Sequence, residues 1–405
     1  MNVLFLTIGR IGSIENHGIY TDLLRCFRNN GHNVYIVHPY EKRTGLKTKL
    51  VEDNGVHILS VSIGNITKCS MIEKGISTLQ IESKFLYAIK KYIKDVTFDL
   101  VLYSTPPITF VKVIQYIKKK DNAKSYLLLK DIFPQNAVDL GILSTKGIKG
   151  ILYQYFRKKE KKLYQISDYI GCMSQANVDY VLKHNPEIKA SKVEICPNCI
   201  EVLDINMSKE EKDKMRERYN IPLDKKVFVY GGNLGKPQGI NFMMECLRSQ
   251  KDNSEVFFLI VGAGTEYGKI EKFIKEEKQQ NVKLMEQMPK DDYDRMIASC
   301  DIGMIFLDYR FTIPNFPSRL LAYMQARLPV LACTDSNTDI GKVIAEDGFG
   351  WWCESSDIKN FKEIINQILA ITTDKIVQMK NKEIQYLRDN YSSEKVYQII
   401  VRRKK

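Results

Sequence analysis

The sequence lacks a hydrophobic segment long enough to cross a membrane. No run of about 18 apolar residues, the length a spanning helix needs, occurs in the chain. The apolar stretch at residues 1–8 is shorter than that and lacks the basic flank of a signal peptide. These absences predict a cytoplasmic protein.

A disulfide framework is also lacking. The nine cysteines are odd in number and lie in apolar surroundings, which favours reduced thiols in a core. One pair, Cys196 and Cys199, has the spacing of a metal or redox site, but no second pair of Cys or His lies near it in the sequence. A turn with incidental cysteines is therefore the favoured interpretation over zinc or redox chemistry.

Acidic residues are too few to balance the basic ones. The chain has 61 Lys and Arg against 48 Asp and Glu, a formal net charge of +13. This excess indicates an anionic partner, which can be nucleic acid, an anionic membrane face or an anionic substrate. Nucleic acid ranks lowest, because no nucleic-acid-binding motif is present and aromatic residues are not interleaved along a basic stripe.

Basic residues concentrate between residues 146 and 165, where apolar residues recur at helical spacing. The pattern predicts a basic amphipathic helix. Such a helix can lie on an anionic bilayer, where each basic residue near the surface contributes roughly 1 kcal/mol. Alternatively, the apolar stripe of the helix packs on its own domain. The two interpretations are compatible if part of the stripe faces the core and part faces the bilayer. The lysines assigned to a membrane surface are Lys158, Lys159, Lys161 and Lys162.

Short strand patterns alternate with helical patterns along the chain, which predicts an α/β fold of parallel sheets covered by helices. The predicted strands cover residues 3–8, 34–38, 57–61, 100–103, 126–129, 169–173 and 193–195, and then 227–230, 256–261, 282–285, 302–305 and 330–332.

The length of 405 residues exceeds what one core usually supports, so two domains are expected. A polar stretch at residues 201–212 separates the two series of strands. We predict two doubly wound, Rossmann-like domains facing a central cleft, with ligands at the carboxyl ends of the strands. The domains cover residues 1–200 and 201–381, and a terminal helix, 382–405, crosses back and packs on the first domain.

The segment 315–332 predicts a loop, a helix and a buried strand. Pro317 suits the position before a helix, Ser318 can cap the helix, and Arg319 adds a cation beside free backbone N–H groups. A diphosphate suits such a helix start. Taken alone, a Pro-Ser helix start is common and often only caps a helix.

A glycine-rich turn at residues 230–239 follows the apolar run 227–229 and precedes a helical pattern at 240–247. This order is strand, flexible loop, helix. Lys236 lies in the loop and supplies a second cation at the end of a strand.

Six motifs together resemble family 4 glycosyltransferases of the GT-B fold, in the branch that builds bacterial capsule, O-antigen and colanic-acid polysaccharides. Each motif is weak alone, but the six follow the family's order at plausible spacing over nearly the whole chain. They lie at residues 103–107, 130–141, 195–199, 230–239, 261–266 and 315–332.

The resemblance implies a hexosyltransferase-type enzyme that moves a sugar from a nucleotide donor, most often a UDP-sugar, to a polyprenyl-diphosphate-linked glycan. It implies retention of anomeric configuration and no metal ion, and no Asp-x-Asp is placed at a strand end to hold one. The first domain would bind the acceptor and the second the nucleotide sugar, at the inner face of the cell membrane.

Negative charge on the departing diphosphate would be stabilised by Lys236, Arg319 and backbone N–H groups. The residues expected to bind the donor are Gly18, Gly232, Asn233, Lys236, Gly262, Gly264, Asn315, Pro317, Ser318, Arg319 and Leu320.

Two further catalytic candidates lie in the first domain, beside Lys236 and Arg319 in the second. His17 follows the first strand in a glycine-bearing loop and can hydrogen-bond the donor; the alternative is a helix-capping histidine. Asp131 at a strand end can orient or deprotonate the acceptor hydroxyl as a general base; the alternative is that it caps the following turn.

The sequence departs from the family pattern at the nucleotide ribose. Ala322 and Pro314 stand where the family has glutamates, and Gln325, Asn315 or backbone groups are the candidates to replace them. This departure leaves a second hypothesis, a catalytically inactive subunit of the same fold that binds a nucleotide, a partner or a membrane. A Rossmann-type dehydrogenase is disfavoured, because neither 9–12 nor 262–264 completes a Gly-x-Gly-x-x-Gly turn.

Overall fold

The computed structural model describes residues 1–203, 205 and 207–403. Two residues of the predicted polar stretch, 204 and 206, and the last two residues of the predicted terminal helix, Lys404 and Lys405, lie outside the described residues. The chain divides into two compact units, Met1–Glu201 with Ser392–Lys405, and Val202–Tyr391. None of the described helices has both the length and the apolar character that a membrane crossing requires.

The first unit contains an eight-stranded sheet of order β3-β4-β2-β1-β5-β6-β7-β8. Its neighbouring strands are parallel except for β3 and β4, an antiparallel pair at the edge of the sheet whose strand β3 was not predicted. Asn54 and Gly55 have φ of 47° and 78°, the left-handed values of a tight hairpin turn, and they reverse the chain there. The strands are β1 (Asn2–Leu6), β2 (Asn33–Glu41), β3 (Lys49–Asp53), β4 (Val56–Ile63), β5 (Leu100–Ser104), β6 (Lys124–Leu129), β7 (Tyr169–Cys172) and β8 (Val193–Ile195).

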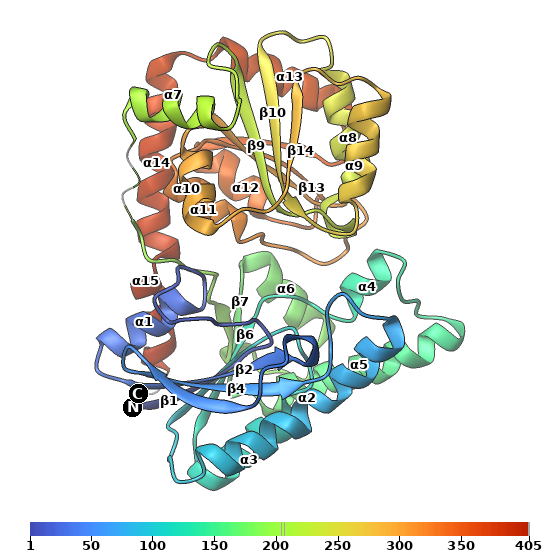
Figure 1. The fold of residues 1–405 in the computed structure, drawn as a ribbon. Helices are drawn as coiled ribbons and strands as arrows, with labels where there is room; N and C mark the ends of the chain where they lie inside the picture. Colours follow the sequence, from blue (N-terminus) through green and yellow to red (C-terminus); the bar gives the residue numbers. More distant parts are fainter. Residues whose placement is uncertain (204, 206, 404–405) are drawn as a thin grey trace. The chain divides into compact units, whose positions relative to one another are not determined.

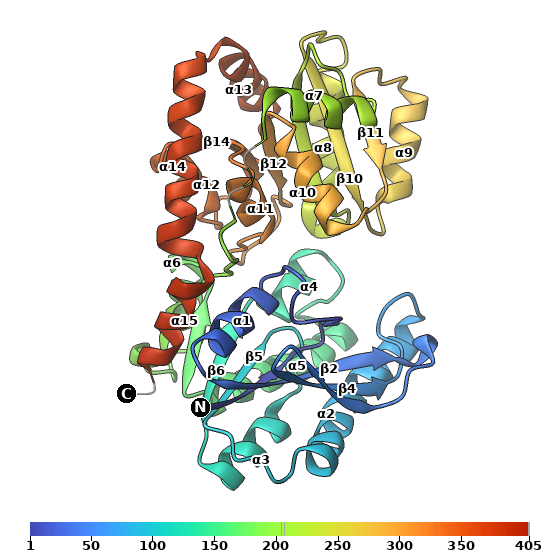
Figure 2. The ribbon, with the colours of Figure 1, turned by 60° about the vertical axis from the view of Figure 1, so that its left-hand side comes forward.

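Helices cover both faces of this sheet. In Figure 1, α2, α3 and α5 lie together on one face, and α1 lies beside α15 on the other, as Figure 2 shows from a second side. The helices are α1 (Thr21–Asn29), α2 (Met71–Tyr92), α3 (Val111–Asp121), α4 (Gln135–Asp139), α5 (Gly147–Ile166), α6 (Gln175–His184) and α15 (Ser393–Arg402).

The second unit contains a six-stranded sheet of order β11-β10-β9-β12-β13-β14, and every neighbouring pair is parallel. The predicted α/β fold with two parallel-sheet units is thus confirmed, although the strand β14 was not predicted. The strands are β9 (Lys226–Asn233), β10 (Val256–Ala263), β11 (Val282–Met285), β12 (Ile302–Phe306), β13 (Val330–Thr334) and β14 (Gly350–Glu354). The helices are α7 (Lys209–Arg218), α8 (Ile240–Ser249), α9 (Tyr267–Glu276), α10 (Lys290–Ala298), α11 (Arg319–Gln325), α12 (Ile340–Glu346), α13 (Ile358–Ala370) and α14 (Thr373–Tyr391).

The predicted terminal helix is two helices. Ser392 has extended backbone angles and its side chain accepts a hydrogen bond from the N–H of Lys395, so it ends α14 and caps α15. Helix α14 packs on α11 within the second unit, and α15 packs on α1 within the first. The second unit therefore extends to Tyr391, beyond the predicted boundary at residue 381.

Helix α14 carries a buried carboxyl group. Glu383 is 0% exposed, and neither of its carboxyl oxygens has a hydrogen-bond partner among the described residues. Burial raises the pKa of Glu383 well above its ordinary value, and the nearby Lys380 only partly opposes this. The folded protein therefore retains this proton at a pH where the unfolded chain has lost it.

We predict that Glu383→Gln raises the melting temperature near neutral pH. Because the pKa is higher in the folded state, that state binds more protons above the unfolded pKa, and stability falls as pH rises toward the folded pKa. The glutamine keeps the shape and cannot ionise, so its advantage should vanish in acid below the ordinary pKa of a glutamate. Thermal melts over a pH series measure this.

The control is Asp389→Asn, which removes an exposed carboxylate from the same helix. An advantage of Glu383→Gln that persists unchanged into acid, or an equal gain in the control, would contradict the assignment.

Candidate functional site

Arg319, the first residue of α11, is a cation without a carboxylate partner among the described residues. Its guanidinium carbon lies 4.3 Å from the centre of the Tyr230 ring, a cation–π distance. Its Nη1 is buried and makes no hydrogen bond to the described part of the chain. A buried N–H without a partner is costly, so this geometry favours an anion as the missing partner.

Three tyrosines shape the surroundings of Arg319. The Tyr323 hydroxyl accepts a hydrogen bond from the N–H of Gly231 at 3.1 Å and donates to the backbone of β12. A Cβ added to Gly231 would overlap the hydroxyl of Tyr293, so only glycine fits under that ring. None of these tyrosines was predicted from the sequence to have a role. The position of Tyr230 before two glycines at the end of a strand could have indicated a role for it. Tyr293 lies far from these glycines in the sequence, so no local pattern indicates its contact with them.

The predicted glycines divide into two groups. Gly232 has a φ of 124°, and a Cβ there would lie 3.7 Å from the guanidinium carbon of Arg319, so this residue is brought to the cation. A Cβ at Gly262 would overlap the carbonyl oxygen of Gly232, and one at Gly264 would overlap that of Leu234. The structure thus gives Gly262 and Gly264 a packing role between the ends of β9 and β10.

The loop after β9 contains the second cation. Lys236 is exposed, and its ammonium group makes no ion pair or hydrogen bond with any residue that the structure describes. Asn233 instead donates from its side chain to Oε1 of Gln238 at 2.9 Å, and the N–H of Gly235 donates to the same oxygen at 3.1 Å. Asn233 therefore shapes the loop, and Lys236 is free to reach a ligand.

The start of α11 differs from the prediction. Ser318 already has helical backbone angles and its side chain makes no capping hydrogen bond, so the predicted cap is wrong. The N–H of Leu320 donates to the carbonyl of Pro317 at 3.2 Å, because a tight turn precedes this seven-residue helix. The Leu320 N–H is thus already paired, which leaves the Arg319 side chain as the candidate anion-binding group of this segment.

Asn315 is held within its own loop. Its N–H donates to the Thr338 hydroxyl at 3.0 Å and its side chain to the Ile313 carbonyl at 3.2 Å. Thr338 in turn donates to Asp335, which follows β13, and burial raises the pKa of Asp335 to about 6. Asp335 was not among the predicted residues, although an acid directly after a buried parallel strand is a usable signal.

At positions 314 and 322, where the family that the sequence resembles has glutamates for the nucleotide ribose, this chain has no carboxylate. Pro314 is buried and Ala322 partly exposed. Gln325 is 7% exposed, and its Oε1 accepts a hydrogen bond from the N–H of Leu203 at 3.1 Å. Gln325 is therefore committed to the segment before α7, and the departure from the family pattern stands.

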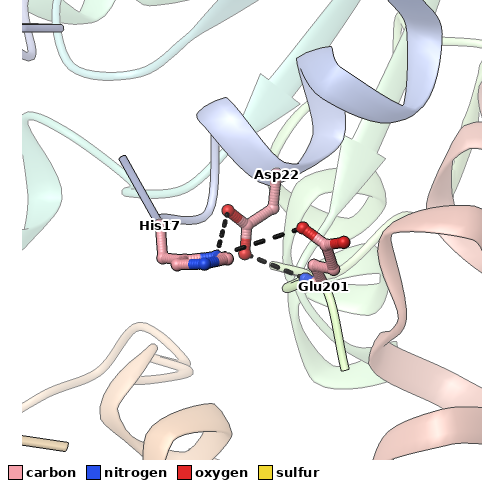
Figure 3. Close-up of side chains that lie close together, drawn as sticks. All are labelled: His17, Asp22 and Glu201. Carbon is pink, nitrogen blue, oxygen red and sulfur yellow. Dashed lines mark hydrogen bonds and ion pairs between the residues drawn. The ribbon is translucent and has the colours of Figure 1, made fainter. Parts of the chain in front are cut away.

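In the first unit, His17, Asp22 and Glu201 lie together near the start of α1 (Figure 3). Nδ1 of His17 is 3.6 Å from Asp22 and 4.0 Å from Glu201, a spacing that suits a metal ion. However, Nη2 of Arg25 lies 2.6 Å from Asp22, 2.9 Å from Glu201 and 3.1 Å from His17. A permanently charged guanidinium thus occupies the centre of the cluster and opposes a cation there.

Arg25 also sets the hydrogen bonding of His17. A guanidinium only donates, so Nδ1 of His17 accepts and the proton of the neutral ring resides on Nε2. The side chain of His17 is 37% exposed, which leaves Nε2–H available to a ligand. The N–H of Gly18 donates to Asp22 at 2.9 Å, so Asp22 closes this turn and Gly18 is not a free donor.

Asp131 follows β6 and is partly buried. Burial raises the pKa of Asp131 to about 6, while the side chain of Asn136 opposes this by donating to both carboxylate oxygens, at 2.8 Å each. A carboxyl with this pKa changes its protonation state near neutral pH, as a general base must.

The basic helix α5 divides its apolar residues between two surfaces. Leu163 is buried in the core, and the Phe156 ring packs on Phe133 with centroids 5.1 Å apart. Ile148 and Ile151 are 88% and 73% exposed. Exposed residues of the same helix are Leu152, Tyr155, Lys158 and Lys162, while Lys159 lies over the Tyr155 ring and Lys161 pairs with Glu187.

Residues 211–386 match the family of glycosyl transferases group 1. The probable glycosyltransferase WbjE of Pseudomonas aeruginosa is 23% identical over 337 residues, which are 83% of this chain and 82% of that protein. The putative colanic acid biosynthesis glycosyl transferase WcaI of Escherichia coli K12 is 23% identical over 206 residues, 51% of this chain and 49% of that protein.

Solved structures share the fold. Sucrose-phosphate synthase from Thermosynechococcus elongatus superposes with a TM-score of 0.78 at 14% identity, covering 99% of this chain and 97% of that one. Anabaena Alr3699/HepE in complex with UDP and glucose gives a TM-score of 0.71 at 13% identity, covering 100% and 99%. The chain therefore has the GT-B fold and carries a glycosyl transferases group 1 domain at residues 211–386, which indicates a glycosyltransferase.

Proposed function

We propose that the chain transfers a sugar from a UDP-sugar to a polyprenyl-diphosphate-linked glycan during synthesis of a bacterial surface polysaccharide such as capsule or O-antigen. The second unit binds the donor and the first binds the acceptor. The colanic acid relative and the UDP and glucose held by the HepE structure support this choice of pathway class and donor.

The unpaired cation at Arg319 carries the proposal. Breaking the bond between sugar and phosphate leaves negative charge on the diphosphate, and a fixed cation in a partly desolvated position stabilises that charge strongly. Arg319 supplies the unpaired N–H, and Lys236 supplies an exposed second cation. With two cations in this role, the proposed transfer needs no metal ion. Retention of anomeric configuration is part of the proposal because the family that the sequence resembles retains it.

In the first unit, Asp131 accepts the proton of the attacking acceptor hydroxyl, because its pKa of about 6 leaves it ionised near neutral pH. His17 donates from Nε2–H to the sugar or the diphosphate. Arg25 acts through His17 by fixing which ring nitrogen carries the proton.

We predict that Arg319→Ala lowers the transfer rate by about 10²–10³-fold, the usual loss when one stabilising donor of a developing anion is removed. UDP should then no longer raise the melting temperature, whereas wild type should be stabilised by UDP with EDTA present. The control is Arg248→Ala, which removes an arginine paired with Glu277 on the surface.

Wild-type affinity for UDP in Arg319→Ala would refute the assignment of this residue. UDP binding by wild type without transfer to any acceptor would instead favour the inactive-subunit alternative, which rests on the missing glutamates at Pro314 and Ala322.

A second prediction concerns pH. Transfer should fall as pH drops below about 6, because protonated Asp131 cannot accept the acceptor's proton. Asn136→Leu removes two hydrogen bonds that stabilise the carboxylate, so the pKa of Asp131 rises and the acid limb of the rate profile moves to higher pH. Initial rates over a pH series measure the limb.

The matched control is Gln135→Leu, since the Gln135 side chain donates to Asp139 rather than to Asp131. A limb that stays in place in Asn136→Leu, or moves equally in the control, would show that Asp131 is not the titrating base.

The exposed part of α5 suits an anionic bilayer at the inner face of the cell membrane. Ile148 and Ile151 form an apolar stripe that its own unit leaves uncovered, and lysines flank it. Apolar burial and attraction to anionic headgroups act together in such helices.

We predict that Ile148→Ser with Ile151→Ser, and separately the fourfold glutamine variant of Lys158, Lys159, Lys161 and Lys162, weaken sedimentation with anionic vesicles by about tenfold or more, given roughly 1 kcal/mol per basic residue. Leu223→Ser with Val377→Ser is the control, because both residues are exposed and apolar but lie in the second unit. Unchanged vesicle binding in both α5 variants would refute the membrane assignment and show that α5 is an ordinary surface helix.

A further inference from the structure

A cavity of about 400 Å³ lies in the first unit between α2 and the edge formed by β3 and β4. Helix α2 lies against β4, as Figure 2 shows. The residues that matter for its chemistry are Thr48, Ser62, Lys84, Tyr87, Lys91 and Tyr92. None of the residues assigned above to transfer or to the membrane lines it, so the cavity is a separate site.

The cavity is basic. Lys84 and Lys91 are seven residues apart on α2 and therefore share one face of the helix. Neither ammonium group pairs with a carboxylate in the described part of the chain, and no acidic residue lines the cavity. Two cations that share one cavity without a counterion favour an anionic ligand.

The walls also offer hydroxyl groups and an aromatic face. The N–H of Ser62 donates to the Thr48 hydroxyl at 3.0 Å, and the Tyr92 hydroxyl donates to the Thr48 carbonyl at 3.4 Å, which holds the wall in place. The hydroxyls of Ser62 and Tyr87 have no hydrogen-bond partner among the described residues. The Tyr87 residue is 67% exposed, so its ring presents an open apolar face beside free donors.

We propose that this cavity binds a saccharide carrying a carboxylate or phosphate group. The lysines neutralise the anion, the hydroxyls of Ser62 and Tyr87 bond the sugar hydroxyls, and the Tyr87 ring covers an apolar face of the sugar. A volume of about 400 Å³ lies in the range of small-molecule sites and holds one or two sugar units. Resting on the proposed function, the inference further assigns the ligand to a part of the acceptor glycan away from the reacting hydroxyl.

The test is a titration of the full chain with three probes: a trimer of galacturonic acid, the neutral trimer maltotriose, and glucose 1-phosphate. Inorganic phosphate is titrated in parallel. We expect saturable binding of one or both anionic sugars, at least tenfold tighter than the neutral trimer. The trimer and the sugar phosphate distinguish a carboxylate ligand from a phosphate ligand.

The double variant Lys84→Gln with Lys91→Gln should lose this binding by tenfold or more, and Tyr87→Ala should weaken it. The matched control is Lys90→Gln, because Lys90 is adjacent on the same helix but lies over the Tyr116 ring at 4.7 Å and does not line the cavity. UDP should raise the melting temperature equally in all these proteins, so a failure here is distinguishable from a failure of the donor-site assignment.

Equal affinity for neutral and anionic trimers, an equal loss in Lys90→Gln, inorganic phosphate binding as tightly as the sugars, or no binding of any probe would each overturn the proposal.

Discussion

Parallel strands covered by helices on both faces leave little place for charged groups except at the strand ends. Residues 3–6 of β1 and 227–230 of β9 are fully buried and carry no charge. The chain therefore gathers its chemistry where strands stop. Asp131 follows β6, the glycine turn beside Arg319 ends β9, and Asp335 follows β13. Within each unit, the candidate residues therefore lie where burial of the sheet leaves room for polar groups.

The two units treat a partly or fully buried arginine in opposite ways. Arg25 meets carboxylates of Asp22 and Glu201 and two backbone carbonyls, so its charge and donors are satisfied within the protein. Arg319 meets the Tyr230 ring, which attracts a cation but leaves an N–H unpaired. The first arrangement orients a neighbouring histidine, whereas the second leaves a buried N–H group without an acceptor, which an anion can supply. Only the second arrangement has the properties of a binding group.

Local patterns in the sequence predicted most of this architecture, because a parallel strand is a short apolar run and needs no knowledge of its neighbours. Local patterns did not predict elements whose structure depends on neighbouring segments. The strand β3 is polar and forms only because the Asn54–Gly55 turn pairs it with β4. The pattern of the last helix is continuous through Ser392, where the structure ends one helix and begins the next. Among the candidate functional residues, Arg319 and Asp131 were recognised from motifs. Tyr293 was not, because its contact with Gly231 joins residues about sixty positions apart and leaves no local signal.

Burial alone does not identify a working carboxyl group. Desolvation raises the pKa of both Asp131 and Glu383, and what separates them is the presence of a donor for the ionised form. Asn136 meets both oxygens of Asp131, which keeps its pKa near 6 and both protonation states accessible. Glu383 meets no donor among the described residues, so its neutral form is fixed over a wide pH range. A buried acid is a candidate base only where the protein has already placed a group that stabilises its anion.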